Sequence, residues 1–236
     1  YPPGSTFKTV TATGILERGV ATPETVVTCK DEIVIDGFPV KCANTAQGVG
    51  TYPFKHAFTF SVNAIFADLG VRLGWTGLTD IARRFGFDSE LPFTLETAAS
   101  QLHSPGSETT QTLLASTAFG QGELLATPLQ MLQVAAAIAN GGVLVQPHLG
   151  LAERDDGRDI GALEPVPSRR IIDDGLAATM RDFMVSVVEN GQANGVSIPG
   201  VKVGGKTGTA EAGDGTSHAW FIAFAPAEAP TVAVAV

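Results

Sequence analysis

A serine and a lysine stand three residues apart near the start of the chain, at Ser5 and Lys8. The pattern of residues 7–17 predicts a helix here, so the two side chains would project from one face and could touch. A lysine can remove a serine proton only if burial or nearby positive charge lowers its pKa. The positive end of the helix dipole acts in that direction, and its free N–H groups can stabilise an oxyanion. Ser5 and Lys8 are therefore a candidate nucleophile and base, although the same spacing also occurs on ordinary protein surfaces.

A second polar pair, Ser61 and Asn63, follows the aromatic stretch of residues 54–60. If the backbone there is extended, both side chains point the same way and present a hydroxyl and an amide together. A hydroxyl can relay a proton to a leaving group, and an amide can hold a substrate carbonyl. The alternative is that one of them is a helix cap, which serine and asparagine favour. On this segment alone, the cap is the better interpretation.

A third cluster is the tetrapeptide Lys206, Thr207, Gly208 and Thr209, on a predicted strand. Glycine in a strand edge lets a peptide-like substrate lie close to the backbone, while the lysine and two threonines can bind a carboxylate. Residues 200–207 also match the phosphate-binding pattern G-x-x-x-x-G-K-[ST]. That pattern must open a helix, whereas residues 210–217 predict a turn and no strand ending in Asp follows to hold Mg²⁺. The carboxylate-binding interpretation is therefore favoured over a nucleotide site.

The composition excludes several function classes. The 236 residues are 44% hydrophobic and 17% charged with a net charge of -9, which predicts a folded protein and disfavours nucleic acid as a partner. Four His and two Cys, without C-x-x-C or H-E-x-x-H, predict no metal site and no cofactor. Residues 124–152 lack charge, but their Pro and Gly interruptions predict a buried helix from Pro128 to Asn140, capped by Thr127, rather than a membrane span.

The elements that must position these residues divide the chain into two parts. Helical periodicity predicts helices in residues 7–17, 54–69, 78–85, 128–140 and 176–188, and β-branched or alternating runs predict strands in residues 25–28, 33–40, 201–209, 219–225 and 231–236. Residues 153–170 are charged, carry two prolines and predict a surface connection. Helices followed by late strands indicate an α+β fold, an antiparallel sheet flanked by helices with a mainly helical lobe.

The three motifs S-x-x-K, S-x-N and K-T-G each occur once, in that order. Together they are the motif set of the penicillin-recognising serine transpeptidases and β-lactamases, and the sequence resembles that family over its whole length. Further matches lie in residues 1–8, 120–122, 127–130, 138–142, 206–211 and 218–221. The chain looks like the transpeptidase domain of a class B penicillin-binding protein, most similar to the A-type enzymes of actinobacteria.

The resemblance implies an acyl-transfer cycle on peptidoglycan stem peptides ending in D-Ala-D-Ala. Ser5 would attack the penultimate D-alanine carbonyl and Lys8 would take its proton. Ser61, with Lys206 near it, would pass a proton to the departing D-alanine, and Asn63 would hold the donor peptide and orient Lys8. β-Lactam antibiotics would imitate the substrate and acylate Ser5.

The resemblance also implies the substrate-binding strand and the setting of the protein. Thr207, Gly208 and Thr209 would receive the terminal carboxylate, and the N–H groups of Ser5 and Thr209 would form the oxyanion hole. Residues 1–236 are then expected to be a transpeptidase domain incomplete at both ends of the fold, without the N-terminal anchor and accessory domain. The expected location is the extracytoplasmic face of the plasma membrane, and cell-wall synthesis or division proteins are expected partners.

Three other interpretations remain open. A serine β-lactamase shares the motifs but needs a group to activate the deacylating water, and no E-x-x-x-N element lies between residues 63 and 206. A non-catalytic β-lactam sensor would keep all three motifs. A scaffolding domain of a division complex would carry them as relics.

Cys29 and Cys42 flank the sequence Asp36-Gly37, a favoured two-residue hairpin turn. This turn would pair Asp31 with Cys42 and set the two cysteines diagonally, roughly 7 to 8 Å apart and beyond the usual disulfide reach. In the oxidising compartment that the resemblance implies, we still predict a disulfide. It would require a bulge or a shifted turn, and its role would be structural and remote from Ser5.

Overall fold

The structure is a computed structural model that describes residues 1–42, 46–150, 153–156, 158–161, 167–211 and 215–236. Its main sheet has three antiparallel strands in the order β11-β10-β9. These are β9 (Gly204–Glu211), β10 (Ser217–Ala225) and β11 (Val232–Ala235). The three late strands are therefore confirmed. The first begins at Gly204 rather than at residue 201 and continues to Glu211, into the segment predicted as a turn.

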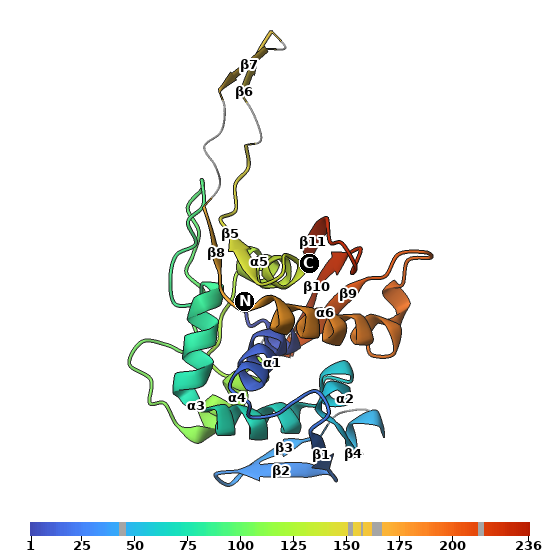
Figure 1. Cartoon of the computed structure of the whole chain (residues 1–236). Helices are drawn as coiled ribbons and strands as arrows, with labels where there is room; N and C mark the ends of the chain where they lie inside the picture. Colours follow the sequence, from blue (N-terminus) through green and yellow to red (C-terminus); the bar gives the residue numbers. More distant parts are fainter. Residues whose placement is uncertain (43–45, 151–152, 157, 162–166, 212–214) are drawn as a thin grey trace.

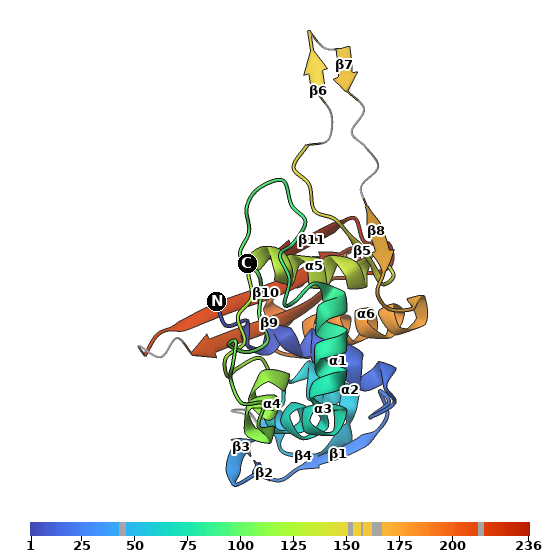
Figure 2. The same ribbon diagram turned by 90° about the vertical axis from the view of Figure 1, so that its left-hand side faces the viewer.

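Three helices lie on one side of this sheet, and two of them pack directly on its strands (Figures 1 and 2). The first, α1 (Lys8–Glu17), continues from the short 3-10 turn η1 (Gly4–Phe7); the others are α5 (Pro128–Ala139) and α6 (Asp174–Glu189). Helix α6 packs against β9, and α5 packs against β10 and β11. The Thr127 hydroxyl accepts a hydrogen bond from the backbone N–H of Gln130 at 3.1 Å, which confirms the predicted cap of α5.

A helical lobe packs on the other side of α1. It consists of α2 (Phe54–Thr59), α3 (Asn63–Phe85) and α4 (Gln111–Ala118). The single helix predicted for residues 54–69 is wrong, because the chain breaks between α2 and α3, where Ser61 has a left-handed φ of 59°. Helix α4 was not predicted, since its apolar residues show little helical periodicity; Thr110 caps it by accepting from the Leu113 amide.

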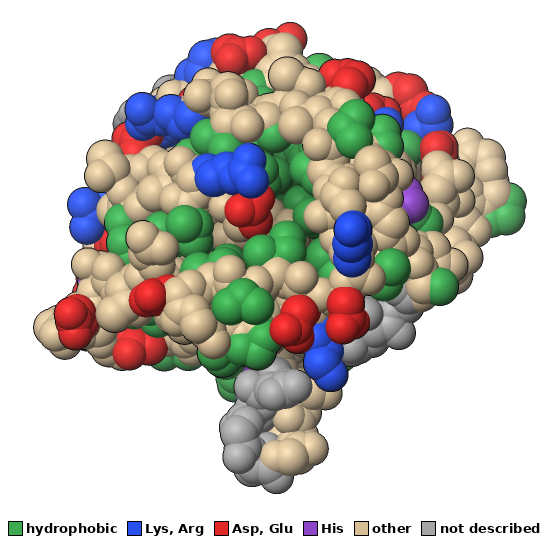
Figure 3. All heavy atoms as spheres, turned by 90° about the horizontal axis from the view of Figure 1, so that it is seen from below, with side chains coloured by type: hydrophobic (Ala, Val, Ile, Leu, Met, Phe, Trp, Pro, Cys, Tyr) green, Lys and Arg blue, Asp and Glu red, His purple; other side chains and the backbone are tan. Residues whose placement is uncertain are grey.

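The region below α3 in Figure 1 contains β1 (Val26–Cys29), β2 (Glu32–Ile35), β3 (Phe38–Lys41), η2 (Ala46–Gly48) and β4 (Gly50–Pro53). The predicted hairpin and its register are confirmed, since Ile35 faces Phe38 and the Cys42 amide donates to the Asp31 carbonyl at 2.8 Å. Seen from below, this face carries hydrophobic side chains between acidic and basic ones (Figure 3). Val26, Val34 and Phe38 are among the exposed large hydrophobic residues here.

Cys29 and Cys42 form a disulfide with their Cα atoms 5.8 Å apart. The prediction that this bond needs a bulge or a shifted turn is wrong. It assumed that residues 25–31 continue the hairpin, whereas β1 leaves it and pairs with β4 instead, with Cys29 opposite Gly50. The change of direction at Lys30 and Asp31 brings Cys29 next to Cys42 without altering the hairpin register.

The predicted surface connection of residues 153–170 contains short strands. Strand β8 (Ser168–Arg170) pairs with β5 (Val143–Val145), and β6 (Glu153–Asp155) pairs with β7 (Arg158–Gly161) in an arm that projects from the body (Figure 1). The last short element, η3 (Asn194–Val196), lies between α6 and β9. In the described part of the chain, no helix is both long and apolar enough to cross a membrane.

Candidate active site

Lys8 is the first residue of α1 and its side chain is fully buried. Its ammonium nitrogen Nζ donates to the Ser61 carbonyl at 2.7 Å, to the Ser61 hydroxyl at 3.1 Å and to the Asn63 Oδ1 atom at 2.6 Å. The first and second motifs therefore meet at one nitrogen atom, although more than fifty residues separate them in sequence.

Neither sequence interpretation of Ser61 and Asn63 matches the local backbone. Ser61 is left-handed rather than extended, and Val62, not a polar residue, occupies the N-cap position of α3 without a side-chain cap. The turn still directs both side chains at Lys8. Their convergence comes from the break between α2 and α3 and not from strand alternation.

Lys206 reaches the same point from β9 and is also fully buried. Its Nζ donates to the Ser61 hydroxyl at 3.0 Å and to the Thr207 carbonyl at 3.1 Å. The hydroxyl of Ser61 thus lies between two buried lysine nitrogens, one from each of the other motifs.

Burial lowers the pKa of both lysines. The pKa of Lys8 falls well below its ordinary value, first because burial penalises the ammonium ion and second because the positive charge of Lys206 repels it. Burial lowers the pKa of Lys206 to about 7. In the part of the chain that the structure describes, no carboxylate forms an ion pair with either lysine. Lys206 can therefore be neutral near pH 7, and the pKa of Lys8 is shifted in the same direction.

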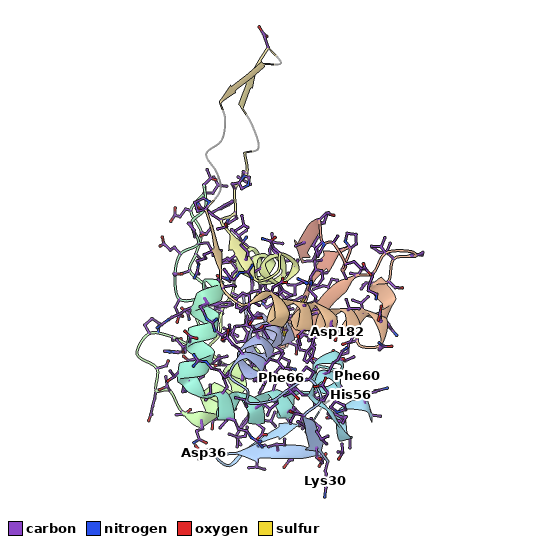
Figure 4. The ribbon with its side chains drawn as sticks, in the orientation of Figure 1. Lys30, Asp36, His56, Phe60, Phe66 and Asp182 are labelled. Atoms are coloured by element: carbon purple, nitrogen blue, oxygen red, sulfur yellow. A yellow bond between two sulfur atoms is a disulfide. The ribbon has the colours of Figure 1, made fainter. Side chains whose placement is uncertain are left out.

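Two aromatic rings help to exclude water from this cluster. The Phe66 ring centre lies 5.4 Å from Lys8 Nζ, and the Phe58 ring centre lies 5.8 Å from Lys206 Nζ. Figure 4 shows Phe66 on α3, beside α1. These phenylalanines were not predicted as site residues; the aromatic stretch around Ser61 was the signal that could have identified them.

Ser5 lies in η1 and is half-buried. Its two neighbours in the chain contact β9 through their backbones. A Cβ atom on Gly4 would lie 2.6 Å from the Thr209 carbonyl oxygen, and a Cβ atom on Gly208 would lie 3.1 Å from the Thr6 amide nitrogen. Only glycine allows this close approach of η1 and β9, which sets Ser5 beside the K-T-G strand.

The residues of the third motif alternate along β9. Lys206 and Gly208 are buried, whereas Thr207 is partly exposed and Thr209 is exposed. The two threonine side chains therefore lie on the side of β9 opposite the lysine, where the Thr207 hydroxyl donates to Gln192 Oε1 at 3.4 Å and Thr209 is open to solvent. In the described residues the element that follows this segment is strand β10, not a helix, which excludes the phosphate-binding loop that the sequence also matched.

The segment of residues 120–122 closes one side of the arrangement. A side chain at Gly120, whose φ is 94°, would overlap the Gly4 carbonyl oxygen. The side-chain amide of Gln121 donates through Nε2 to the Thr209 carbonyl at 3.4 Å. Gln192, which no motif indicated, lies on another side and contacts Phe60 and Thr207.

The sequence matches the family described as penicillin binding protein transpeptidase domain over residues 1–236, the whole chain. The chain belongs to this family. It is 38% identical over its whole length to the peptidoglycan D,D-transpeptidase PbpA of Mycobacterium tuberculosis, and 31% identical over 99% of its length to the stage V sporulation protein D of Bacillus subtilis. The chain spans 49% of the PbpA sequence, about half of that protein.

Solved structures agree with this assignment. The imipenem acyl-enzyme complex of penicillin-binding protein A from M. tuberculosis superimposes with a TM-score of 0.88 at 37% identity, over 100% of this chain and 55% of that one. The D,D-transpeptidase domain of a peptidoglycan glycosyltransferase from Eggerthella lenta gives 0.87 at 34% identity, over 100% of this chain and 60% of that one. The resemblance to actinobacterial A-type proteins and the predicted transpeptidase-like α+β fold are confirmed.

Proposed function

We propose that this chain is the catalytic portion of a serine D,D-transpeptidase, which cross-links peptidoglycan stem peptides through an acyl-enzyme on Ser5 and is acylated there by β-lactams. The observation that carries the proposal is the Ser61 hydroxyl held between two buried lysines of lowered pKa, next to η1. The acyl-enzyme structures of the M. tuberculosis protein support it by analogy.

Lys8 is suited to act as the base for Ser5. A neutral lysine amine has two N–H bonds and one lone pair. The Ser61 carbonyl and the Asn63 Oδ1 atom, at 2.7 and 2.6 Å, only accept hydrogen bonds and so occupy the two N–H groups. The lone pair then faces the Ser61 hydroxyl at 3.1 Å and can accept a hydroxyl proton. In the reaction Ser5 would attack a carbonyl and deliver its proton to this lone pair while the new C–O bond forms.

Ser61 and Lys206 are suited to the second half of the acylation. The tetrahedral intermediate collapses when the bond to the leaving D-alanine breaks and its nitrogen gains a proton. Ser61 donates that proton and recovers one from Lys8, which took it from Ser5 and whose Nζ lies 3.1 Å from the Ser61 hydroxyl, while Lys206 Nζ, at 3.0 Å, holds that hydroxyl in place. The proton taken from Ser5 thus leaves with D-alanine, and the acceptor amine of a second stem peptide releases the acyl group by the reverse path.

The exposed side of β9 is suited to hold the donor peptide. The Thr209 hydroxyl would bind the terminal carboxylate, and the Thr207 hydroxyl would join it by turning its one proton from Gln192 Oε1 to the substrate. Gly208 leaves no side chain between β9 and η1. The amides of Ser5 and Thr209 would stabilise the oxyanion, because the close contact between Gly4 and Thr209 brings these backbones together.

Residues 1–236 would act as the transpeptidase domain of a longer protein at the extracytoplasmic face of the plasma membrane. Stem peptides ending in D-Ala-D-Ala and β-lactams would be its ligands, and cell-wall synthesis or division proteins its partners. The family and the length of the relatives that this chain matches support these assignments.

Fluorescent penicillin and mass spectrometry test the proposal on the complete protein. We expect one stable adduct, on Ser5, and none on Ser5→Ala. Lys8→Arg keeps the charge but cannot act as a base, so acylation should slow by at least about a hundredfold. The acylation rate of the wild type should rise with pH as the lysines become neutral.

Other outcomes would contradict the proposal. Labelling of Ser5→Ala at another serine would refute Ser5 as the nucleophile. Rapid hydrolysis of the adduct would indicate a β-lactamase, and no adduct would indicate a scaffold. A stable penicillin adduct without cross-linking of stem peptides would indicate a sensor.

A further inference from the structure

Gln192 lies at the surface between the two segments that carry Ser61 and Lys206. Its Nε2 atom donates to the Phe60 carbonyl at 3.1 Å, and its Oε1 atom accepts from the Thr207 hydroxyl at 3.4 Å. Phe60 immediately precedes Ser61, and Thr207 immediately follows Lys206. Gln192 therefore bridges the same two segments as the buried bond between Lys206 and Ser61, but from the exposed side.

The backbone around Gln192 is fixed at the end of α6. Its neighbours Gly191 and Ala193 are both buried. A side chain at Gly191 would overlap the Thr59 carbonyl, so the end of α6 lies directly against the end of α2. The hydroxyls of Thr59 and Ser186 join the same two helices at 2.6 Å. The amide of Gln192 is thus presented from a rigid support, as positioning groups require.

The turn that Gln192 contacts has a conformation that needs support. Ser61 has a φ of 59°, which residues other than glycine disfavour and which persists only when surrounding contacts impose it. On the inner side, Lys8 holds the Ser61 carbonyl. On the outer side, Gln192 holds the preceding carbonyl, and the rings of His56 and Phe60 lie together at 4.4 Å (Figure 4).

We propose that Gln192 is a positioning residue for this site. By holding the Phe60 carbonyl and the Thr207 hydroxyl, it keeps the Ser61 hydroxyl between the two lysines and keeps water away from them. Its effect on the reaction rests on the function proposed above, but its effect on the lysines does not. Loss of Gln192 would admit water, lessen the burial of Lys206 and raise the pKa of that lysine toward its ordinary value.

The test uses Gln192→Met, which keeps the length of the side chain without its hydrogen bonds, and Gln111→Met as a control at an exposed glutamine on α4. At saturating penicillin, the limiting acylation rate of Gln192→Met should fall roughly tenfold, the scale of a small misplacement of a catalytic group. It should recover in part at higher pH, because more of the lysine is then neutral. Gln111→Met should match the wild type.

Gln192→Glu tests the donor and the acceptor role of the Gln192 side chain separately. It keeps an acceptor for Thr207 and loses the donor to Phe60, so its limiting rate should fall as in Gln192→Met. If Gln192→Glu kept the limiting rate of the wild type, the positioning role would be overturned. It would also be overturned if Gln192→Met lost so much melting temperature that unfolding explained its lower rate.

An NMR titration of the Lys206 side chain gives a readout that does not depend on acylation. The pKa should be higher in Gln192→Met than in the wild type, and an unchanged titration would overturn the inference. If the wild type does not react with penicillin but the titration shifts, the proposed function fails and the positioning role stands. If the wild type reacts and Gln192→Met matches it in rate and titration, the positioning role alone fails.

Discussion

At the residue scale, the site depends on placing two ammonium groups where they are unstable. Lys8 and Lys206 are fully buried, and in the described residues their partners are hydroxyl, carbonyl and amide oxygens rather than carboxylates. A carboxylate would stabilise the charged form and raise the lysine pKa, which would remove the base. The absence of a carboxylate from these contacts is therefore what the proposed chemistry requires.

The same burial predicts a pH dependence of stability. The pKa of Lys206 is about 7 in the folded protein against an ordinary value of 10.5. Between these values the unfolded chain binds more protons, so the free energy of unfolding should increase as pH rises from 7 toward 10, and below 7 the penalty is fully present. Replacing Lys206 by methionine removes this penalty but also removes the hydrogen bonds to the Thr207 carbonyl and to the Ser61 hydroxyl, which keeps Lys8 as a partner.

We therefore expect Lys206→Met to be inactive but more stable than the wild type at pH 7, by on the order of 1–3 kcal/mol. Its stability should also depend less on pH. Urea unfolding at pH 7 and pH 9 measures both effects, with Lys30→Met as a control at an exposed lysine. A Lys206→Met protein less stable than the wild type at pH 7 would show that its hydrogen bonds outweigh its burial.

At the scale of elements, the site is assembled where η1, β9 and the segment of residues 120–122 meet. Three glycines make this junction possible, because their neighbours are backbone atoms that cannot move aside independently. Gly4 packs on Thr209, Gly208 packs on Pro3 and Thr6, and Gly120 packs on Gly4. The position of Ser5 is thus set by backbone contacts on both sides.

Gly120→Ala tests this junction. Its new Cβ would overlap the Gly4 carbonyl, so η1 must shift, and acylation by penicillin should slow at least about tenfold. Gly106→Ala is the matched control: its φ of 83° also disfavours alanine, but nothing lies within 4 Å of the new atom. The control should lose about 1–2 kcal/mol of stability and keep its acylation rate. Equal acylation rates in the two variants would contradict the role of the contact.

At the scale of the whole molecule, the disulfide region and the lysine cluster are separate. Figure 4 shows Lys30, the neighbour of Cys29, and Asp36 at the lower edge of the molecule, away from Phe66 beside Lys8. The bond closes a loop with a sequence separation of 13 and ties β1 to the hairpin of β2 and β3. This arrangement indicates a structural role.

Reduction of Cys29–Cys42 should lower the free energy of unfolding by about 3 kcal/mol, the scale expected for a loop of about 15 residues. Penicillin labelling below the unfolding transition should persist. Thiol titration of the unfolded, unreduced protein should find no free thiol, and the double variant Cys29→Ser/Cys42→Ser should not respond to reductant. Loss of labelling on mild reduction, with the far-UV circular dichroism unchanged, would refute the separation from the site.

Elements whose pattern is local can be predicted from the sequence alone. The cap at Thr127, the turn at Asp36-Gly37 and the late strands depend on neighbouring residues, and the structure confirms them. The order of the three motifs and the resemblance also indicate the family. Helix α4 and the break before Ser61 were missed, because the first has a weak apolar pattern and the second depends on packing against α6.

The way in which the three motifs meet depends on tertiary packing. Lys8, Ser61 and Lys206 are far apart in the chain, and their hydrogen bonds form because α1, the turn after α2 and β9 pack together. The lowered pKa values of the two lysines and the bridge made by Gln192 have no local sequence signal. The pKa of a group depends on how much water and charge surround it. Around the two lysine nitrogens, part of that environment comes from Phe58 and Phe66, which other segments of the chain supply.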